Sequence, residues 1–287
     1  MDGGSGRVKE VPVHPDLEII RRFDRPGPRY TSYPTAVEFH EGVGEDEYRR
    51  HLARIDGSVP LSLYAHLPFC EHRCLFCGCH VVITPHMPVA EQYLEYLKLE
   101  MGRVAGLLPE RADVAQMQWG GGTPTYFSPD QLADLMGAFG AHFRFQEGAE
   151  VAIEVDPRVT SEAHLSRLAE VGFNRLSMGV QDLNPAVQKA ITRDQTFEQT
   201  ARLMEQARSA GFREGINLDL VYGLPEQELA SFEKNLSQVL SLRPDRVALY
   251  SFAYVPWVKG HQKKLDESSL PSPDLKLQLY LSAMERF

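Results

Sequence analysis

Four cysteines lie within ten residues of this 287-residue chain, at Cys70, Cys74, Cys77 and Cys79, and the chain contains no others. Their spacing is C-x3-C-x2-C, followed by one more thiol two residues later. Cysteines that serve only packing need no such spacing. Three thiolates on one tight loop can hold three irons of a cuboidal iron–sulfur cluster and leave the fourth iron open to a substrate or cofactor. We therefore expect Cys70, Cys74 and Cys77 to be metal ligands, with the chemistry taking place at the open iron.

Two other interpretations of the cysteine cluster stay open. A zinc knot would use Cys70, Cys74, Cys77 and either Cys79 or His80, and the protein would then be a zinc-bound interaction module. Structural zinc sites usually take two ligand pairs that are well separated in the sequence, whereas these candidates crowd one loop. A redox dithiol would use the C-x-x-C pair, but the surrounding pattern is not thioredoxin-like. The spacing therefore favours a cluster.

Composition and charge narrow the class of protein. The chain is 43% hydrophobic and 24% charged, as in ordinary globular proteins. Its 30 basic and 39 acidic residues give a net charge of −9, which argues against general nucleic-acid binding. The first residues carry no apolar signal core, and the uncharged run 247–258 is too short to span a bilayer. We expect a cytoplasmic protein, a monomer with no membrane partner, whose thiols are metal ligands rather than disulfides.

Apolar segments alternate with segments of helical periodicity from about residue 60 onward. Strands are predicted at 61–69, 115–120, 151–155, 175–180, 215–224 and 246–255, and helices at 89–107, 128–144, 160–171, 184–211 and 228–242. Strands that alternate with helices predict a parallel sheet with right-handed crossovers. The sequence therefore predicts an α/β fold, a partial (β/α)6 TIM-like barrel with an irregular N-terminal extension. A doubly wound sheet is the alternative.

The chain divides into four predicted regions. Residues 1–15 read as a flexible lead-in, 16–59 as an N-terminal extension that contributes to a substrate site, 60–260 as the barrel, and 261–287 as the start of a helical region. The amphipathic pattern that begins near Pro273 reaches Phe287 without a stop signal. We therefore expect the C-terminal region to be incomplete and the sequence to be a fragment.

Several polar and glycine residues lie at the carboxyl ends of predicted strands, where β/α barrels build their sites. The run Gly120–Gly122 follows a strand directly and exposes backbone to a ligand, unless it is only a tight turn. Glu154 closes an otherwise apolar strand, either as a ligand contact or as a solvated strand end. Gln181, Arg193 and Asp219 are weak signals individually, although the guanidinium of Arg193 suits a carboxylate.

The cysteine motif, with Phe76 before the third cysteine, resembles the signature of the radical S-adenosylmethionine enzymes. The resemblance implies a 4Fe–4S cluster on Cys70, Cys74 and Cys77, with S-adenosylmethionine bound to the fourth iron. It also implies radical chemistry through a 5′-deoxyadenosyl group, which belongs to the cofactor and which the protein houses.

A narrower resemblance rests on motifs that occur in order along the chain. They are Arg29-Tyr-Thr-Ser-Tyr-Pro-Thr35, Tyr64-Ala-His-Leu-Pro-Phe-Cys70, Cys77-Gly-Cys79, Trp119-Gly-Gly-Gly-Thr-Pro-Thr125, Glu154-Val-Asp-Pro-Arg158, Arg175-Leu-Ser-Met-Gly-Val-Gln181 and Asp219-Leu-Val-Tyr-Gly-Leu-Pro225. Together they resemble the oxygen-independent coproporphyrinogen III oxidases, from about residue 16 to the last. Those enzymes continue into a helical domain beyond the point where this sequence stops, so the resemblance implies a C-terminally truncated member whose turnover is in doubt.

The resemblance implies a reaction and its partners. Coproporphyrinogen III would be decarboxylated oxidatively to protoporphyrinogen IX in heme biosynthesis, with an electron donor and an electron acceptor that the sequence does not identify. The alternative is a heme-binding chaperone on the same barrel. Chaperones of that kind typically lack the cysteine that stands here at Cys79, so its presence favours the oxidase.

The resemblance also assigns residues to roles. The expected contacts to two S-adenosylmethionine molecules are Tyr64, Phe76, Gly121, Gly122, Thr123, Glu154, Gln181, Arg193, Asp219 and Ala253. Cys79 and Tyr64 are candidates for a catalytic role, and an inert thiol is the alternative for Cys79. The four propionates of the substrate need cations, for which Arg21, Arg22, Arg25 and Arg29 are candidates, unless they form only a solvated basic segment.

Overall fold

The computed structural model describes residues 17–23, 34–35, 38–212 and 215–287. The chain divides into two compact units, residues 1–50 and 51–287. Helix α1 (Leu17–Phe23) belongs to the first unit, and helix α2 (Glu45–Leu52) begins in it. Arg21 and Arg22 lie on α1 with exposed side chains, whereas Arg25 and Arg29 lie outside the described residues. The role of this segment in substrate binding therefore stays a prediction.

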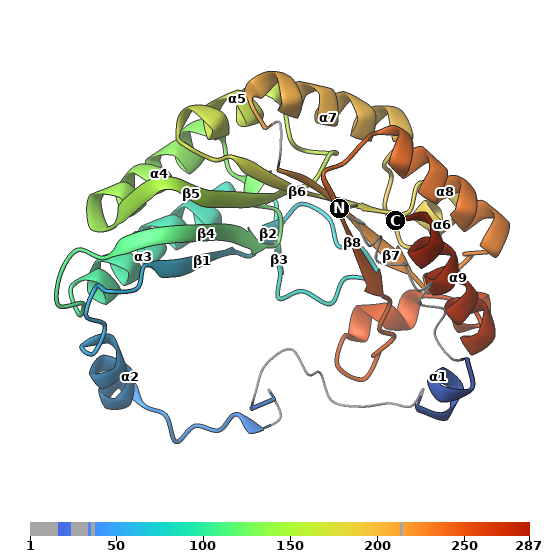
Figure 1. Ribbon diagram of the computed structural model, residues 1–287, viewed down its shortest axis with the longest axis horizontal. Helices are drawn as coiled ribbons and strands as arrows, with labels where there is room; N and C mark the ends of the chain where they lie inside the picture. Colours follow the sequence, from blue (N-terminus) through green and yellow to red (C-terminus); the bar gives the residue numbers. More distant parts are fainter. Residues whose placement is uncertain (1–16, 24–33, 36–37, 213–214) are drawn as a thin grey trace, which may run out of the picture. The chain divides into compact units, whose positions relative to one another are not determined.

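The second unit is built on one parallel sheet of six strands. They are β1 (Leu61–Leu67), β4 (Asp113–Gly121), β5 (Arg144–Val155), β6 (Arg175–Gln181), β7 (Ile216–Tyr222) and β8 (Arg246–Ser251). Their spatial order, β1-β4-β5-β6-β7-β8, follows the order along the chain. In the described residues β1 and β8 have no pairing with each other, so the sheet is an open arc (Figure 1). The predicted partial barrel is confirmed, because a doubly wound sheet would reverse its strand order.

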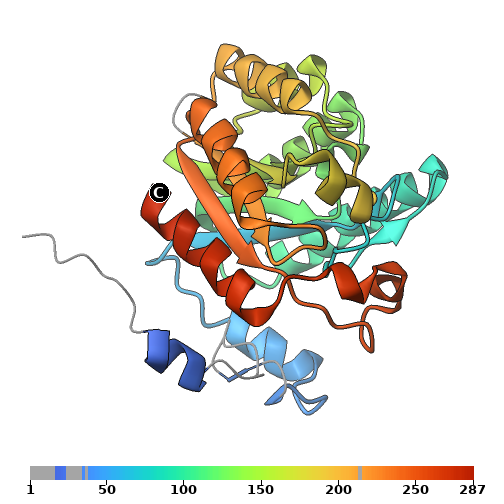
Figure 2. The same ribbon diagram turned by 90° about the vertical axis from the view of Figure 1, so that its right-hand side faces the viewer.

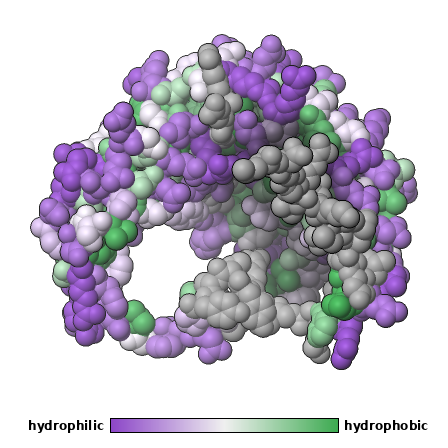
Figure 3. All heavy atoms as spheres, viewed as in Figure 1, coloured by the Kyte–Doolittle hydropathy of each residue, from purple (hydrophilic) through white to green (hydrophobic). Residues whose placement is uncertain are grey.

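Helices cover the outer face of this sheet, as Figure 1 shows. They are α3 (Met87–Ala105), α4 (Pro129–His142), α5 (Glu162–Glu170), α7 (Phe197–Ala210), α8 (Leu229–Ser241) and α9 (Pro273–Arg286). Three of them, α4, α5 and α7, begin with capping boxes at Ser128, Ser161 and Thr196, which satisfy the first free backbone N–H groups. The buried face of each helix packs on the sheet, while hydrophilic side chains are frequent on the outer side of this layer (Figure 3).

The predicted C-terminal helical region begins with two 3-10 turns, η3 (Gly260–Lys264) and η4 (Glu267–Ser269). Helix α9 follows and lies beside α8 in Figure 2. Arg286 at its end donates to the hydroxyl of Ser237 at 2.8 Å. Helix α9 therefore adds to the same helical layer that covers the sheet. None of the described helices combines the length and the apolar character that a membrane span requires.

The single helix predicted over 184–211 is wrong. The structure has α6 (Pro185–Ala190) and α7 (Phe197–Ala210), separated by residues 191–196. Thr192 takes a left-handed backbone conformation with φ of 54°, and the backbone N–H of Leu75 donates to the carbonyl oxygen of Ile191 at 3.0 Å. The break therefore ties this segment to the cysteine loop and buries Arg193 at the sheet edge. A short parallel pair, β2 (Phe69–Cys70) with β3 (Val82–Ile83), also escaped the sequence pattern, because each strand has only two residues.

A buried hydrogen-bond network joins the ends of β6 and β7. One oxygen of Asp182 accepts from the backbone N–H of Asn184 at 2.7 Å, and the other accepts from the side-chain N–H of Gln227 at 2.7 Å. Gln227 in turn accepts from the backbone N–H groups of Gly223 and Leu224. Asp182 is 1% exposed, and burial raises its pKa to about 6. The network fixes two loops that border the sheet edge where the site lies.

We predict that Asp182→Asn lowers the free energy of unfolding at pH 7 by about 1–3 kcal/mol, because the new amide N–H would face the N–H donor of Gln227. The folded-state pKa of Asp182 is raised, so its contribution to stability is largest below the unfolded-state value and is lost as pH rises through about 6. The wild type should therefore gain about 1 kcal/mol relative to the variant between pH 7 and pH 5. Urea unfolding at both pH values measures this, and a difference between the two proteins that is independent of pH would contradict it.

Candidate functional site

The cysteine loop connects β2 to β3 and is held on both sides. On one side the pairing of β2 with β3 aligns Cys70 with Ile83. On the other side, the segment after β8 donates to the loop's carbonyl groups. His261 contacts the carbonyl oxygen of Cys77 at 2.9 Å, and Lys259 donates to that of Cys79 at 3.0 Å. The loop backbone is therefore fixed before any ligand binds, which is what a multidentate thiolate site requires.

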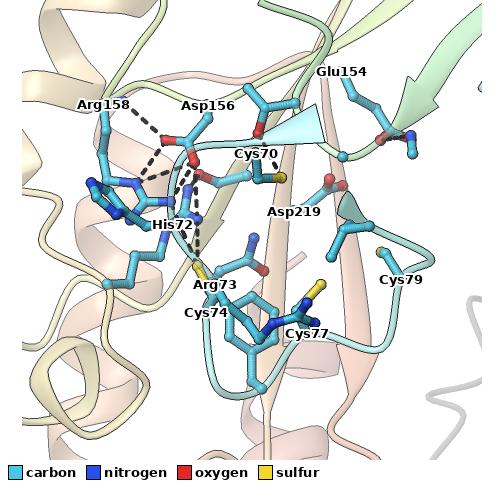
Figure 4. A pocket seen from close by; sticks show the side chains of 18 of the residues that line it. Cys70, His72, Arg73, Cys74, Cys77, Cys79, Glu154, Asp156, Arg158 and Asp219 are labelled. Atoms are coloured by element: carbon cyan, nitrogen blue, oxygen red, sulfur yellow. Dashed lines mark hydrogen bonds and ion pairs between the residues drawn. The ribbon is translucent and has the colours of Figure 1, made fainter. Parts of the chain in front are cut away.

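A cavity of about 170 Å³ lies between this loop and the carboxyl ends of β4 to β7, and Figure 4 shows a part of its lining. It gathers all four cysteines and eight of the ten predicted cofactor contacts: Phe76, Gly121, Gly122, Thr123, Glu154, Gln181, Arg193 and Asp219. The remaining two, Tyr64 and Ala253, do not line it. The side chain of Ala253 is exposed just after β8. Most of the predicted cofactor contacts therefore line the same cavity.

Each predicted cluster ligand has a different hydrogen-bond partner. The sulfur of Cys70 lies 3.5 Å from the hydroxyl of Thr123. The sulfur of Cys74 accepts from the guanidinium groups of Arg158 at 3.6 Å and Arg193 at 3.7 Å. A hydrogen bond from the Cys79 thiol lowers the pKa of Cys77 to about 6, and the same bond raises the pKa of Cys79. Such partners tune the potential of thiolate-bound clusters.

An ion cluster lies behind Cys74. Asp156, just beyond β5, pairs with Arg158 at 2.6 Å and with Arg193 at 3.3 Å. All three side chains are largely buried, at 11%, 19% and 5% exposure. Burial opposes ionisation of Asp156, but the two guanidinium groups outweigh it and hold the pKa of this carboxyl below its usual range. Two cations therefore share one carboxylate next to a cluster sulfur.

Two further carboxylates face the cavity from neighbouring strands. Glu154 accepts from the backbone N–H of Gly121 at 3.2 Å, and Asp219 accepts from Asn217 at 2.7 Å and from Ser177 at 3.2 Å. Burial raises the pKa of both groups, and the charge of Asp219 raises that of Glu154 further. Two buried carboxylates that repel each other across a cavity form a site suited to a cation.

The end of β4 requires glycine for steric reasons. A Cβ atom on Gly120 would lie 2.6 Å from a carboxylate oxygen of Glu154. Gly121 has a φ of +119°, and a Cβ there would lie 2.6 Å from the ring of His66. The sequence predicted that a ligand approaches this glycine backbone closely. In the structure the side chains of Glu154 and His66 also lie close to it.

Tyr64 reaches the edge of the site through His66. The ring nitrogen Nε2 of His66 lies 2.9 Å from the carbonyl oxygen of His80, which can only accept, so Nε2 carries the proton. In the neutral tautomer Nδ1 then accepts from the hydroxyl of Tyr64 at 3.0 Å. Burial and the charge of Glu154 raise the pKa of Tyr64. The hydroxyl is therefore held in a protonated state beside Gly121 and Gly122, which we call the glycine wall.

Gln181 shows backbone strain at the last residue of β6. Its φ is 69°, and the pairing of β6 with β7 shifts register between Gly179 and Gln181. A non-glycine residue held in the left-handed region is unusual and is a common feature of functional sites. The conformation turns Gln181 toward the cavity, where a Cβ on Gly179 would lie 2.8 Å from its amide nitrogen.

Sequence reasoning missed the roles of Asp156 and Arg158, although both lie in a quoted motif. Their position just after the Glu154 strand is the signal that could have found them, because charged residues at a strand's carboxyl end belong to the site edge. It also missed Ser177 and Asn217, which hold Asp219. Their alternation with buried residues along β6 and β7 places them on the cavity face.

The donor set fits an iron–sulfur cluster. Three thiols line one cavity, and N–H, O–H or S–H donors reach their sulfurs. Within the described part of the chain, no three His, Cys, Asp or Glu side chains are arranged as the ligands of a metal ion. In a cuboidal cluster each thiolate binds a different iron, so the sulfurs need not converge on one point.

Comparison with known proteins gives the class first. The Radical SAM superfamily matches residues 64–239, which include the cysteine loop and the strands that face it. The chain belongs to this superfamily, which binds a 4Fe–4S cluster and S-adenosylmethionine.

Individual relatives carry a narrower name. The chain is 44% identical to the oxygen-independent coproporphyrinogen III oxidases of Helicobacter pylori J99 and Escherichia coli K12, over 92% of this chain and 58% and 57% of those proteins. The solved structure of coproporphyrinogen III oxidase from Escherichia coli, described as a radical SAM enzyme, matches with a TM-score of 0.87 and 42% identity over 94% of this chain and 60% of that one. The chain thus spans a little over half the length of these relatives.

We predict that Gly121→Ala destabilises the protein by about 1–3 kcal/mol, because alanine disfavours the positive φ and its Cβ would displace His66. Urea unfolding should show the loss, and the affinity for S-adenosylmethionine should fall as the wall moves. Gly137→Ala in α4 is the matched control, since its Cβ would meet open space, and it should leave stability unchanged or raise it by up to about 1 kcal/mol. Equal effects of the two substitutions would contradict the prediction.

Proposed function

We propose that the protein carries out the oxygen-independent oxidative decarboxylation of coproporphyrinogen III to protoporphyrinogen IX. The observation that carries the chemistry is the single cavity in which three cluster-type thiols face two buried carboxylates. The substrate comes from the names of relatives that match 92% of the chain. For each of two propionates, a hydrogen atom leaves the β-carbon, carbon dioxide departs, a vinyl group forms, and one electron passes to an acceptor.

The cluster with S-adenosylmethionine would supply the 5′-deoxyadenosyl radical that abstracts the hydrogen atom. Cys70, Cys74 and Cys77 would hold the cluster. The protein's own contribution is to bind, orient and shield. The carboxylates of Glu154 and Asp219 suit the ammonium and sulfonium groups of the cofactor, and the strained Gln181 presents its amide to the same cavity. Cys79 hydrogen-bonds Cys77, and Tyr64 borders the glycine wall, so both remain candidates for a catalytic role.

We propose two S-adenosylmethionine sites, as the resemblance implies. Glu154 and Asp219 lie on different strands, and each has its own hydrogen-bond support. Tyr64 and Ala253 lie outside the cluster cavity and would belong to the contacts beyond it. For the substrate, we propose that Arg21, Arg22, Arg25 and Arg29 pair with propionates, since a tetracarboxylate needs cations on a chain with a net charge of −9.

Equilibrium binding of S-adenosylmethionine to the cluster-loaded protein should give two molecules per chain. Glu154→Gln should weaken one of the two sites by about tenfold or more, because a charge-assisted contact to a cation is lost. Glu147→Gln at the opposite end of β5 has an exposed side chain and should leave both sites unchanged. A stoichiometry of one molecule per chain would contradict the second site and would leave the proposal of the first site unaffected.

Anaerobic incubation of the 287-residue protein with coproporphyrinogen III, S-adenosylmethionine and a low-potential reductant should yield the divinyl product. Cys74→Ser should abolish product and iron binding together, and Arg29→Ala should raise the Michaelis constant. Stable heme binding without decarboxylation would support the chaperone instead. A colourless protein that holds one zinc would support the interaction module, whereas a brown protein bleached by dithionite would exclude it.

A further inference from the structure

Cys74 is distinguished from the other two predicted ligands because its sulfur accepts hydrogen bonds from two guanidinium groups; the charges of Arg73 and Lys259 also act on Cys77. Cys70 contacts a neutral hydroxyl and Cys77 a thiol, whereas the sulfur of Cys74 lies 3.6 Å from Nη2 of Arg158 and 3.7 Å from Nη1 of Arg193. Cys74 is also the most buried of the four cysteines. Figure 4 shows Arg158 and Asp156 on the side of the cavity where Cys74 lies.

The geometry of Arg158 is fully determined by Asp156. Its Nε donates to both carboxylate oxygens, at 3.0 and 3.2 Å, and its Nη2 donates to Oδ2 at 2.6 Å. The backbone N–H of Arg158 donates to the same carboxylate at 3.0 Å. A planar guanidinium held along one edge by a carboxylate has fixed directions for its other N–H groups. One of them, the second N–H of Nη2, points at the sulfur of Cys74.

The side chain of Arg193 is likewise held in place by hydrogen bonds within the protein. Its Nε donates to Gln195 at 2.9 Å and its Nη2 to the carbonyl oxygen of Gly179 at 2.7 Å, which leaves Nη1 to face Asp156 and Cys74. Most of its donors are therefore used by the protein itself.

Arg158 and Arg193 also form a wall. Both line the cluster cavity, and both line a second cavity of about 890 Å³ that lies between α6, α7 and α8 and has Lys189 and Lys234 on its border. The two guanidinium groups thus separate the Cys74 corner of the site from a larger, open groove.

From this geometry we infer that Arg158, oriented by Asp156, is a positioning residue for the cluster: it directs a cationic N–H at the sulfur of Cys74, raises the reduction potential of the cluster, and shields that corner from the second cavity. A cationic N–H donor withdraws electron density from a ligating sulfur and favours the reduced, more negative state of the cluster. Loss of the wall would expose the same sulfur to water. The inference needs only the cluster, which the superfamily implies, and is independent of the substrate.

The experiment is a redox titration of the reconstituted protein, followed by electron paramagnetic resonance, with iron retention under a chelator as a second readout. Arg158→Gln should shift the midpoint potential to more negative values and speed the loss of iron. Arg158→Lys keeps the charge but loses the fork, so it should give a smaller shift in the same direction. Asp156→Asn releases the orientation of Arg158 but also removes a negative charge near the cluster; because these two effects oppose each other, its shift should be smaller than that of Arg158→Gln.

Arg144→Gln is the matched control, because Arg144 also pairs with an aspartate, Asp113, but lies at the other end of β5. It should leave both the potential and iron retention unchanged. A potential for Arg158→Gln equal to that of the control, or a shift to more positive values, would overturn the inference. If Arg158→Gln fails to hold a cluster, Arg158→Lys decides the question: a shift to more negative values supports the inference, and no shift overturns it. None of these outcomes depends on porphyrin turnover, so the proposed function is tested separately.

Discussion

The parallel register of the central strands is the constraint on which the site depends. Glu154 pairs with Ser177, Ser177 with Asn217, and Gly179 with Asp219 across three neighbouring strands. Along β6 and β7 these residues alternate with fully buried ones, such as Leu176 and Leu218, which face the helices. Because side chains alternate with a period of two, a slip of one residue would turn the carboxylates into the helix layer and the leucines into the cavity. The burial of the apolar face of the sheet against the helices therefore fixes the position of the carboxylates on its other face.

The same edge of the sheet holds buried charges, whose energetic cost the fold alone does not explain. Asp156, Arg158 and Arg193 are charged and largely buried, and buried ion pairs are often no more stabilising than apolar residues of similar size. Here several N–H groups of the two arginines have specific acceptors, among them the carbonyl oxygen of Gly179 and the sulfur of Cys74. Removing such a network of charges from water is costly, so its presence indicates that the direction of its hydrogen bonds matters. The direction it sets is toward Cys74, a predicted cluster ligand.

The parts that sequence reasoning recovered are those with a local signature. The six strands follow from periodicity, and the gathering of the cysteines and Glu154 in one cavity follows from residue types at strand ends, whereas Asp219 was only a weak signal. The break between α6 and α7 could not be predicted in that way, since the apolar periodicity runs through it. It depends on a backbone hydrogen bond from Leu75 to Ile191, which joins segments more than a hundred residues apart. Asp182 was missed for a related reason, because its partner Gln227 lies on another loop and nothing near it in the sequence marks it as buried.

The distribution of charge within the cavity separates two tasks. At the Cys74 side two arginines share Asp156, so that corner carries a net positive charge and suits thiolates and an anionic cluster. At the strand side Glu154 and Asp219 have no ion pair among the described residues, and burial raises the pKa of each. A cation that enters there relieves the repulsion between the two carboxylates and holds them in the ionised form. The affinity for a cationic cofactor should therefore rise with pH as these groups lose their protons, while the cluster corner, whose carboxylate is already ionised, stays unchanged. One cavity thus combines an anion-binding and a cation-binding half, which is the arrangement that an anionic cluster and a sulfonium cofactor require of a shared site.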